Sequence, residues 1–434
     1  MGYPKAPLLF WLLCIATAAA DSPQRDSAAW WPPNEPDAEA LKILEAIEAA
    51  GAYGRPELET RKTLNYAYTA GDVTPYRHKE PFKQHFLQQM EYTGPRRADP
   101  EPENIESVKI GFIGPIEPTV SVATGGHSHE EDLGQSMLQG AQLALEVANR
   151  RGGYLKRSIP FELVIRNDNG LWGASGNEII DMAYNKDVWG ILGTIDGANT
   201  HIAIRVALKA EIVMMNSGDT DPTLVETNIP WIFRCISDDR QQSYILLDYI
   251  YRKLDLKRIA VIRASNRYGR FGVREIRDGS RRLGRPIALE MAYPVGSSDF
   301  ALHLGRIDRA GVDAVVHWGD GADGAKILNQ MRELGMEHPF YSCDRCVSDE
   351  FIQIAGDNAE GVVCGFPWDP TRNDPRYQGF AEAYRERFNE EPETYAAHGF
   401  DGMSMLLSGV STHVLLLSSP GKPSRILKKI QLRI

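Results

Sequence analysis

Residues 188–222, VWGILGTIDGANTHIAIRVALKAEIVMMNSGDTDP, contain the pattern on which the fold prediction depends. Two short apolar runs, at residues 191–192 and 212–215, are typical of strands that a parallel sheet buries on both faces. Between them, residues 199–210 have apolar side chains at the spacing of a covering helix. The stretch therefore predicts a strand, a helix and a second strand of a parallel α/β sheet.

Both predicted strands end in small polar residues, GTIDG at 193–197 and NSGDT at 216–220. Ligands of open α/β sheets bind at the carboxyl ends of the strands. A helix that begins behind such a loop also offers free N–H groups to an anion. These two loops therefore predict one half of a small-molecule site.

The same alternation continues on both sides of this stretch. We expect strands at 108–113, 161–165, 258–262, 287–292 and 314–318, and helices at 133–151, 174–186, 241–253, 272–283, 299–310 and 324–334. The pattern restarts after residues 230–233, so the chain predicts two wound blocks, and clefts between such blocks are favoured ligand sites.

Composition excludes some classes of protein. The chain has 434 residues, 43% of them hydrophobic and 24% charged, as is ordinary for globular proteins, and it is long enough for two or three domains. Its formal net charge of −10 argues against a general nucleic-acid binder, which would need a basic face.

The first 20 residues have the pattern of a secretory signal peptide. Lys5 precedes an apolar run at 8–15, and an alanine-rich segment ends at Ala20, after which we expect cleavage and export to the periplasm or medium. Lipid attachment at Cys14 is the less favoured alternative, because bulky Leu13 precedes it. No later run of about 18 apolar residues predicts a membrane span.

Residues 21–106 lack the regular alternation of the later chain. They predict a mainly helical extension that ends in a linker rich in proline and charge at 94–103. Two interpretations stay open: the extension docks a partner, or it packs as an appendage on the main domain.

Five stretches, in order, resemble type I periplasmic binding proteins, the leucine/isoleucine/valine-binding group with its amide- and urea-binding relatives. They are GFIGP at 111–115, GAQLALEVANRRGG at 140–153, RIAVIRASNRYGRFG at 258–272, FIQIAGDNAEGVV at 351–363 and YAAHGFDGMSML at 395–406. The resemblance implies two Rossmann-like lobes with parallel sheets, joined by hinge crossovers and closing on a ligand. Lobe 1 would comprise 107–236 and 366–407, and lobe 2 would comprise 237–365.

The resemblance ends at Leu407. The family continues with further helices, a third crossover and a closing strand, whereas this chain continues with a short basic segment, 408–434. Two interpretations stay open: the segment is a divergent substitute, or the chain is a truncated version of its relatives. The lack of a closing strand would expose a sheet edge and loosen the hinge.

The resemblance also implies ligand-binding residues in the first lobe. Thr194 would meet the carboxylate of an amino-acid ligand, and Gly218 and Thr220 would hold carboxylate and amine. Asp219 stands where relatives have a small residue. Thr194 is also suited to capping the helix that follows it.

Three more positions follow from the resemblance in the second lobe. Tyr268 matches a tyrosine of the first strand-to-helix turn, Asp320 falls where relatives often have an aromatic, and Asp344 matches the acid that takes the amine. Alternatively, Tyr268 is a turn aromatic and Asp320, in the run GDGADG, a turn residue. With Asp219, these two acids would make the site anionic and favour an amine or a cationic side chain.

Four cysteines follow the signal peptide: Cys235, Cys343, Cys346 and Cys364. In an oxidising compartment an even number predicts disulfides. The spacing of Cys343 and Cys346 favours a short structural bridge that frames Asp344, since neither a thioredoxin context nor a second zinc-ligand pair is present. The family layout implies a second bridge, Cys235–Cys364, between neighbouring strands.

No metal, cofactor or catalytic motif is predicted. The run His127-Ser128-His129-Glu130-Glu131-Asp132 suggests a metal site, but a solvated loop is the favoured interpretation. Phosphate-binding and nucleophile-elbow motifs are absent from the sequence, so the chain is not expected to be an enzyme.

The expected function is that of an extracytoplasmic solute-binding protein. It would capture an amino acid or a related small amide or amine, such as urea, and deliver it as a monomer to an ABC importer. The alternatives are a ligand-binding sensor subunit that signals through a separate membrane partner, and a structural homologue that binds nothing.

Overall fold

The computed structural model describes residues 104–117, 129–168, 172–225, 229, 231–369 and 371–417. The predicted signal peptide with Cys14, nearly all of the extension at 21–106, His127, and the tail beyond residue 417 lie outside these residues. The described chain forms two compact units. The second lobe is Arg240–Thr371; the first lobe comprises the described residues up to Asp239 and from Arg372.

The first lobe contains a five-stranded parallel sheet in the order β2-β1-β3-β4-β5. Its strands are β1 (Val108–Gly114), β2 (Phe161–Asn167), β3 (Gly190–Leu192), β4 (Val213–Asn216) and β5 (Ile232–Arg234). The chain adds β2 on one side of β1 and β3 on the other, so the winding direction changes between β1 and β3. Ligands of such sheets bind beside this change, at the carboxyl edge.

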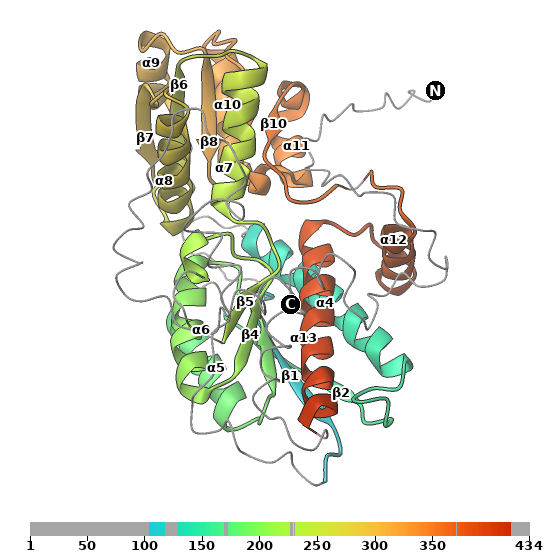
Figure 1. Ribbon diagram of the computed structural model, residues 1–434. Helices are drawn as coiled ribbons and strands as arrows, with labels where there is room; N and C mark the ends of the chain where they lie inside the picture. Colours follow the sequence, from blue (N-terminus) through green and yellow to red (C-terminus); the bar gives the residue numbers. More distant parts are fainter. Residues whose placement is uncertain are drawn as a thin grey trace, which may run out of the picture. The chain divides into compact units, whose positions relative to one another are not determined.

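Helices flank both faces of this sheet (Figure 1). They are α4 (His129–Arg150), α5 (Trp172–Tyr184), α6 (Gly197–Ala210), α12 (Pro375–Phe388) and α13 (Thr394–Leu417), with a short 3-10 turn η3 (Pro222–Leu224). Figure 1 shows α5 and α6 side by side on one face of the sheet, and α4 beside α13 on the other. The elements predicted from apolar spacing are thus present, with helix starts shifted by a few residues.

Two glycines allow α4 and α13 to approach closely. A Cβ atom on Gly140 would lie 2.0 Å from the carbonyl oxygen of Ala396, and one on Gly399 would lie 2.2 Å from that of Met137. Helix α13 continues to Leu417. The first ten residues of the segment predicted as a divergent tail, 408–417, therefore belong to this helix.

The second lobe contains another five-stranded parallel sheet, in the order β10-β9-β8-β6-β7. Its strands are β6 (Ile259–Ala264), β7 (Leu289–Tyr293), β8 (Ala314–Trp318), β9 (Phe340–Ser342) and β10 (Val363–Cys364). Its helical elements are α7 (Asp239–Asp248), the π-helical turn η4 (Tyr249–Lys253), α8 (Arg267–Arg282), α9 (Ala301–Arg309), α10 (Gly321–Glu333), η5 (Asp344–Cys346), α11 (Asp349–Ala355) and η6 (Gly356–Ala359).

Each sheet is buried on both faces, which explains the short apolar runs of the sequence. In the first lobe Ile191 and Met214 are fully buried among Ala203 and Ala207 of α6. In the second lobe all five residues of β8 are buried. The predicted fold class, two lobes built on parallel sheets, is confirmed.

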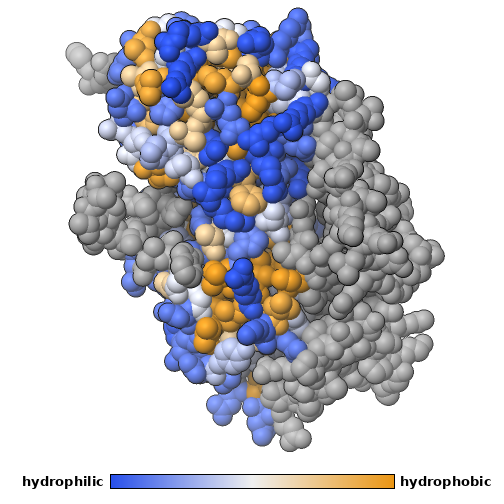
Figure 2. All heavy atoms as spheres, turned by 90° about the vertical axis from the view of Figure 1, so that its left-hand side faces the viewer, coloured by the Kyte–Doolittle hydropathy of each residue, from blue (hydrophilic) through white to orange (hydrophobic). Residues whose placement is uncertain are grey.

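Some apolar side chains lie on the surface of the first lobe. Figure 2 shows hydrophobic side chains in the lower half of the view, on the face that α5 and α6 form, where Ile180, Tyr184 and Leu208 are about half exposed. Within the described ranges, no helix is long and apolar enough to cross a membrane.

Candidate functional site

The loop after β3 carries Thr194, the first predicted ligand contact. Thr194 is fully buried, and its Oγ1 lies 2.7 Å from Oγ1 of Thr200 and 3.3 Å from the carbonyl oxygen of Asp196. The N-cap of α6 is Asp196, whose carboxylate accepts the N–H of Ala198 at 2.7 Å. The capping role considered for Thr194 therefore belongs to Asp196, and the threonine hydroxyl is bound inside the lobe.

Asn216 joins the loops after β3 and β4. Its side-chain Nδ2 donates to the carbonyl oxygen of Thr194 at 3.0 Å, and its Oδ1 accepts the N–H of Asp219 at 2.9 Å. The side chain is fully buried. This residue was not predicted from the sequence, although an asparagine that directly ends a buried strand is a recognisable signal.

Gly218 and Thr220 lie in the same loop. A Cβ atom on Gly218 would lie 2.9 Å from Cγ1 of Ile195 and 3.1 Å from the carbonyl oxygen of Thr194, so any side chain here would force these neighbours to shift. Thr220 is buried, and its carbonyl oxygen accepts the N–H of Asp239 at 2.8 Å. The four first-lobe positions predicted from the sequence thus meet at the carboxyl edge of the sheet.

Asp219 is a buried acid, with 4% of its surface exposed. Its Oδ1 accepts the N–H of Asp221 at 3.0 Å, whereas Oδ2 accepts no hydrogen bond from the described residues. Burial, reinforced by the neighbouring Asp221 charge, raises the pKa of Asp219 to about 7. Both effects penalise the ionised carboxylate in the absence of a bound cation.

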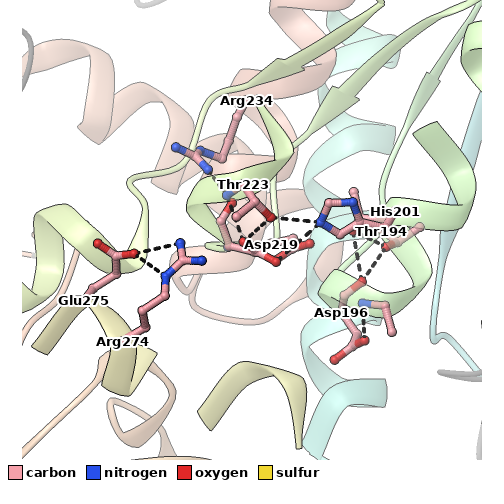
Figure 3. Close-up of polar contacts among 11 residues, drawn as sticks. Thr194, Asp196, His201, Asp219, Thr223, Arg234, Arg274 and Glu275 are labelled. Atoms are coloured by element: carbon pink, nitrogen blue, oxygen red, sulfur yellow. Dashed lines mark hydrogen bonds and ion pairs between the residues drawn. The ribbon is translucent and has the colours of Figure 1, made fainter. Parts of the chain in front are cut away.

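Asp221 holds a second set of polar groups, of which Thr223, His201 and Arg234 are labelled in Figure 3. It accepts the N–H and the hydroxyl of Thr223 at 2.8 and 2.7 Å, and the Nε2 atom of His201 lies 3.5 Å from it. Arg234 donates to the carbonyl oxygen of Asp221 and to Asp238, each at 2.8 Å. This network was not predicted from the sequence; the run GDTDPT, with an aspartate that caps a proline-initiated turn, was its available signal.

In the second lobe, Tyr268 and Asp344 form a direct pair. The tyrosine, in the first turn of α8, donates its hydroxyl to Asp344 Oδ1 at 2.6 Å. Asp344 begins η5, with one residue between it and the end of β9, and is 3% exposed. Burial raises its pKa, and the Tyr268 hydroxyl and the Arg345 charge act in the opposite direction. The two residues, 76 positions apart in the sequence, are thus in contact.

Asp320 is bound to a residue that was not predicted from the sequence. Arg345 forms an ion pair with Asp320 at 2.7 Å, and its guanidinium carbon lies 3.9 Å from the centre of the Tyr268 ring. The predicted anionic site therefore contains a buried cation, which neutralises Asp320. In the sequence, the sign of this ion pair was a basic residue directly after Asp344, in the loop that follows a strand.

A further charge network in this lobe centres on Glu275 of α8. Its buried carboxylate lies 3.0 Å from Arg240 and 2.9 Å from Arg274, and the Arg274 pair is drawn in Figure 3. Removing either arginine would leave part of a buried negative charge without its partner.

The four cysteines within the described residues are free thiols, so neither predicted disulfide is formed in the structure. Cys343 Sγ donates to the carbonyl oxygen of Gly319 at 3.2 Å, and Cys346 Sγ lies 2.9 Å from Ser342 Oγ. Cys364 ends β10 of the second sheet, whereas Cys235 follows β5 of the first. The two residues belong to different lobes, and the Cys235–Cys364 bridge stays a prediction.

The described residues contain no group of three or more metal-binding side chains. His317, the most deeply buried histidine among them, is held by Tyr293 at 2.7 Å and Ser342 at 2.9 Å. Burial lowers its pKa to about 3, so it is a neutral core residue.

Comparisons with known proteins match this architecture. A family described as "Periplasmic binding protein" matches residues 107–415. The Leu/Ile/Val-binding protein homolog 1 of Brucella abortus is 27% identical over 274 residues, 63% of this chain and 72% of the relative. The amino acid binding protein of Pseudomonas aeruginosa is 27% identical over 305 residues, 70% of this chain and 78% of the relative.

A solved structure shares the fold. It is the branched-chain amino acid transporter substrate binding protein LivJ from Streptococcus pneumoniae in complex with isoleucine, with a TM-score of 0.62 and 21% identity. The match covers 75% of this chain and 87% of that one. Because the family match spans both lobes, we conclude that the chain belongs to the periplasmic binding protein family, whose members bind solutes outside the cytoplasm and are not enzymes.

Proposed function

We propose that this protein captures an amino acid or a related small amide or amine and delivers it to an ABC importer in the membrane. The observation that supports this most directly is the pair Tyr268–Asp344. A buried acid at the carboxyl end of β9, oriented by a 2.6 Å hydrogen bond, is suited to hold an amino group.

Polar groups of the first lobe support the same class of solute. Asp219, Thr220 and Thr194 are all at least nine-tenths buried at the carboxyl edge of their sheet. Buried polar side chains at such an edge are the usual means by which α/β folds recognise small ligands. They are therefore the residues to which we assign contacts with the solute in this lobe.

The names of two similar proteins support a role in transport. One is named an amino acid binding protein, and the solved neighbour is titled a transporter substrate binding protein with bound isoleucine. We therefore prefer delivery to an importer over the sensor alternative. We expect the protein to be exported, with cleavage after Ala20, and to act as a monomer; N-terminal sequencing and gel filtration test these points.

A thermal-shift screen of the purified protein against amino acids, amides, amines and urea tests the solute class. A solute at a hundred times its dissociation constant should stabilise the protein by about 2.7 kcal/mol. Asp344→Asn should abolish the shift by an amine-bearing solute. Glu333→Gln, an exposed acid on α10 of the same lobe, should leave it unchanged. No shift with any of these solutes would contradict the proposal.

A further inference from the structure

Two of the threonine hydroxyls near the first-lobe site, those of Thr194 and Thr200, are engaged with each other and with a backbone carbonyl, whereas Thr220 is a separate group. Thr194 and Thr200 contact each other at 2.7 Å, and the carbonyl oxygen of Asp196 lies 3.0 Å from Thr200 Oγ1 and 3.3 Å from Thr194 Oγ1. One of the two hydroxyl protons forms the hydrogen bond between Thr194 and Thr200, and the other forms a hydrogen bond to the carbonyl oxygen of Asp196. Only lone pairs remain, so this pair accepts hydrogen bonds rather than donating them.

Asp219 is a second acceptor at the same place. Its Oδ2 is buried without a well-aligned donor among the described residues, and the Thr200 hydroxyl, the side-chain donor nearest to this carboxylate, is shared with Asp196 and Thr194. A buried carboxylate oxygen without a donor loses its hydration without compensation. A solute that brings an N–H donor would remove this cost.

The local charges favour a cation. The strongest neighbouring charges that act on Asp219 are those of Asp221 and Asp196, both acidic. The nearby arginine, Arg234, is held by Asp238 and by a backbone carbonyl. A solute carboxylate placed here would meet three acids, whereas an ammonium or guanidinium group would be attracted by all of them.

We infer that the first lobe binds a cationic nitrogen group of the solute through Asp219, in place of the α-carboxylate that the family resemblance assigns to Thr194. The inference rests on the proposed solute-binding function and narrows its substrate class. The preferred solute is an amine or a guanidinium compound without a carboxylate at that end.

Calorimetric titration with matched solute pairs tests the inference. Arginine and agmatine differ only in the α-carboxylate, as do leucine and 3-methylbutylamine; acetamide and urea are the neutral probes. We expect one carboxylate-free amine to bind at least about tenfold more tightly than its amino-acid counterpart, the size of one charge-assisted hydrogen bond gained or one repulsion avoided.

Variants test the residue itself. Asp219→Asn keeps an oxygen for the N–H of Asp221 but loses the charge, and should weaken amine binding about tenfold or more. Glu162→Gln, an exposed acid at the opposite end of the same sheet, should leave the affinity unchanged. Thermal unfolding of both variants verifies that they are folded.

The outcomes separate the two proposals. If only carboxylate-bearing or only neutral solutes bind, or if folded Asp219→Asn binds amines as wild type does, the inference is overturned and the solute-binding function stands. If none of the six solutes binds, the inference is overturned, and the proposed function fails as well when the thermal-shift screen of amino acids, amides, amines and urea also finds no binder.

Discussion

Tyr268 donates a 2.6 Å hydrogen bond to the carboxylate of Asp344, a residue that is 3% exposed. The same tyrosine ring lies under the guanidinium of Arg345, 3.9 Å away. One aromatic side chain thus orients the acid and covers the cation of this strand-end cluster. The hydrogen bond to Asp344 and the ring contact with Arg345 can be removed by separate substitutions.

Tyr268→Phe removes the hydroxyl and keeps the ring. Because that hydroxyl lowers the pKa of Asp344, its loss should raise the pKa further and reduce the ionised fraction at neutral pH. Calorimetry should show about tenfold weaker binding of an amine-bearing solute. Tyr249→Phe, a tyrosine of the same lobe whose ring contacts Tyr341, is the control and should bind normally. Equal affinities for both variants would contradict the role of Tyr268.

Arg345→Met should destabilise the second lobe by about 3 kcal/mol, because it leaves the charge of Asp320 in a partly buried place without its partner. Urea unfolding measures the loss. In the Arg345→Met background, Asp320→Asn should cost less than in wild type. The exposed pair Arg385–Glu391 is the control, and Arg385→Met should cost less than about 1 kcal/mol. Additive effects of the two substitutions in the first pair would show that the ion pair does not stabilise the lobe.

Asp219→Asn should change the pH dependence of stability. The folded-state pKa of Asp219 is about 7, against roughly 3.9 when unfolded. The folded protein therefore holds this proton more tightly, and the free energy of unfolding that Asp219 contributes falls as pH rises from about 4 to about 7. The variant should gain stability over wild type across this window, by on the order of 4 kcal/mol at most, with no further change above it. Urea unfolding between pH 4.5 and 8 measures the difference; a constant difference would contradict the raised pKa.

Gly272→Ala should destabilise the protein by about 1–3 kcal/mol through overpacking. A Cβ atom at this position of α8 would lie 2.0 Å from Nε1 of Trp318, which is fully buried in β8. Gly305→Ala in α9 is the matched control, since its nearest neighbour would be the flexible end of Arg309 at 3.6 Å. That change should stabilise the helix by about 0.5–1 kcal/mol. Thermal unfolding compares the two, and a Gly272→Ala variant as stable as wild type would show that α8 can move away from β8.

Local patterns were sufficient to predict the fold. Strands such as Ile191–Leu192 in β3 and the whole of β8 are short and apolar because both faces of each sheet are covered, and this is visible in the residues themselves. The loops after β3 and β4 could also be predicted, because small polar residues follow each apolar run directly in the sequence. Asp196 was an available signal for the start of α6. What the sequence determined by itself was therefore the succession of elements and the edge at which polar residues collect.

The partner of each polar group was decided by the tertiary structure. Arg345 binds Asp320, 25 positions away, and Asp344 binds Tyr268, 76 positions away. The parallel register of β6, β8 and β9 brings these loops together, and hydrogen-bond choice depends on ångström distances that no local pattern encodes. For the same reason, Thr194 could be predicted as a hydroxyl at the strand end, but only the folded loop placed Thr200 and Asp196 around it and left Asp219 as the open acceptor.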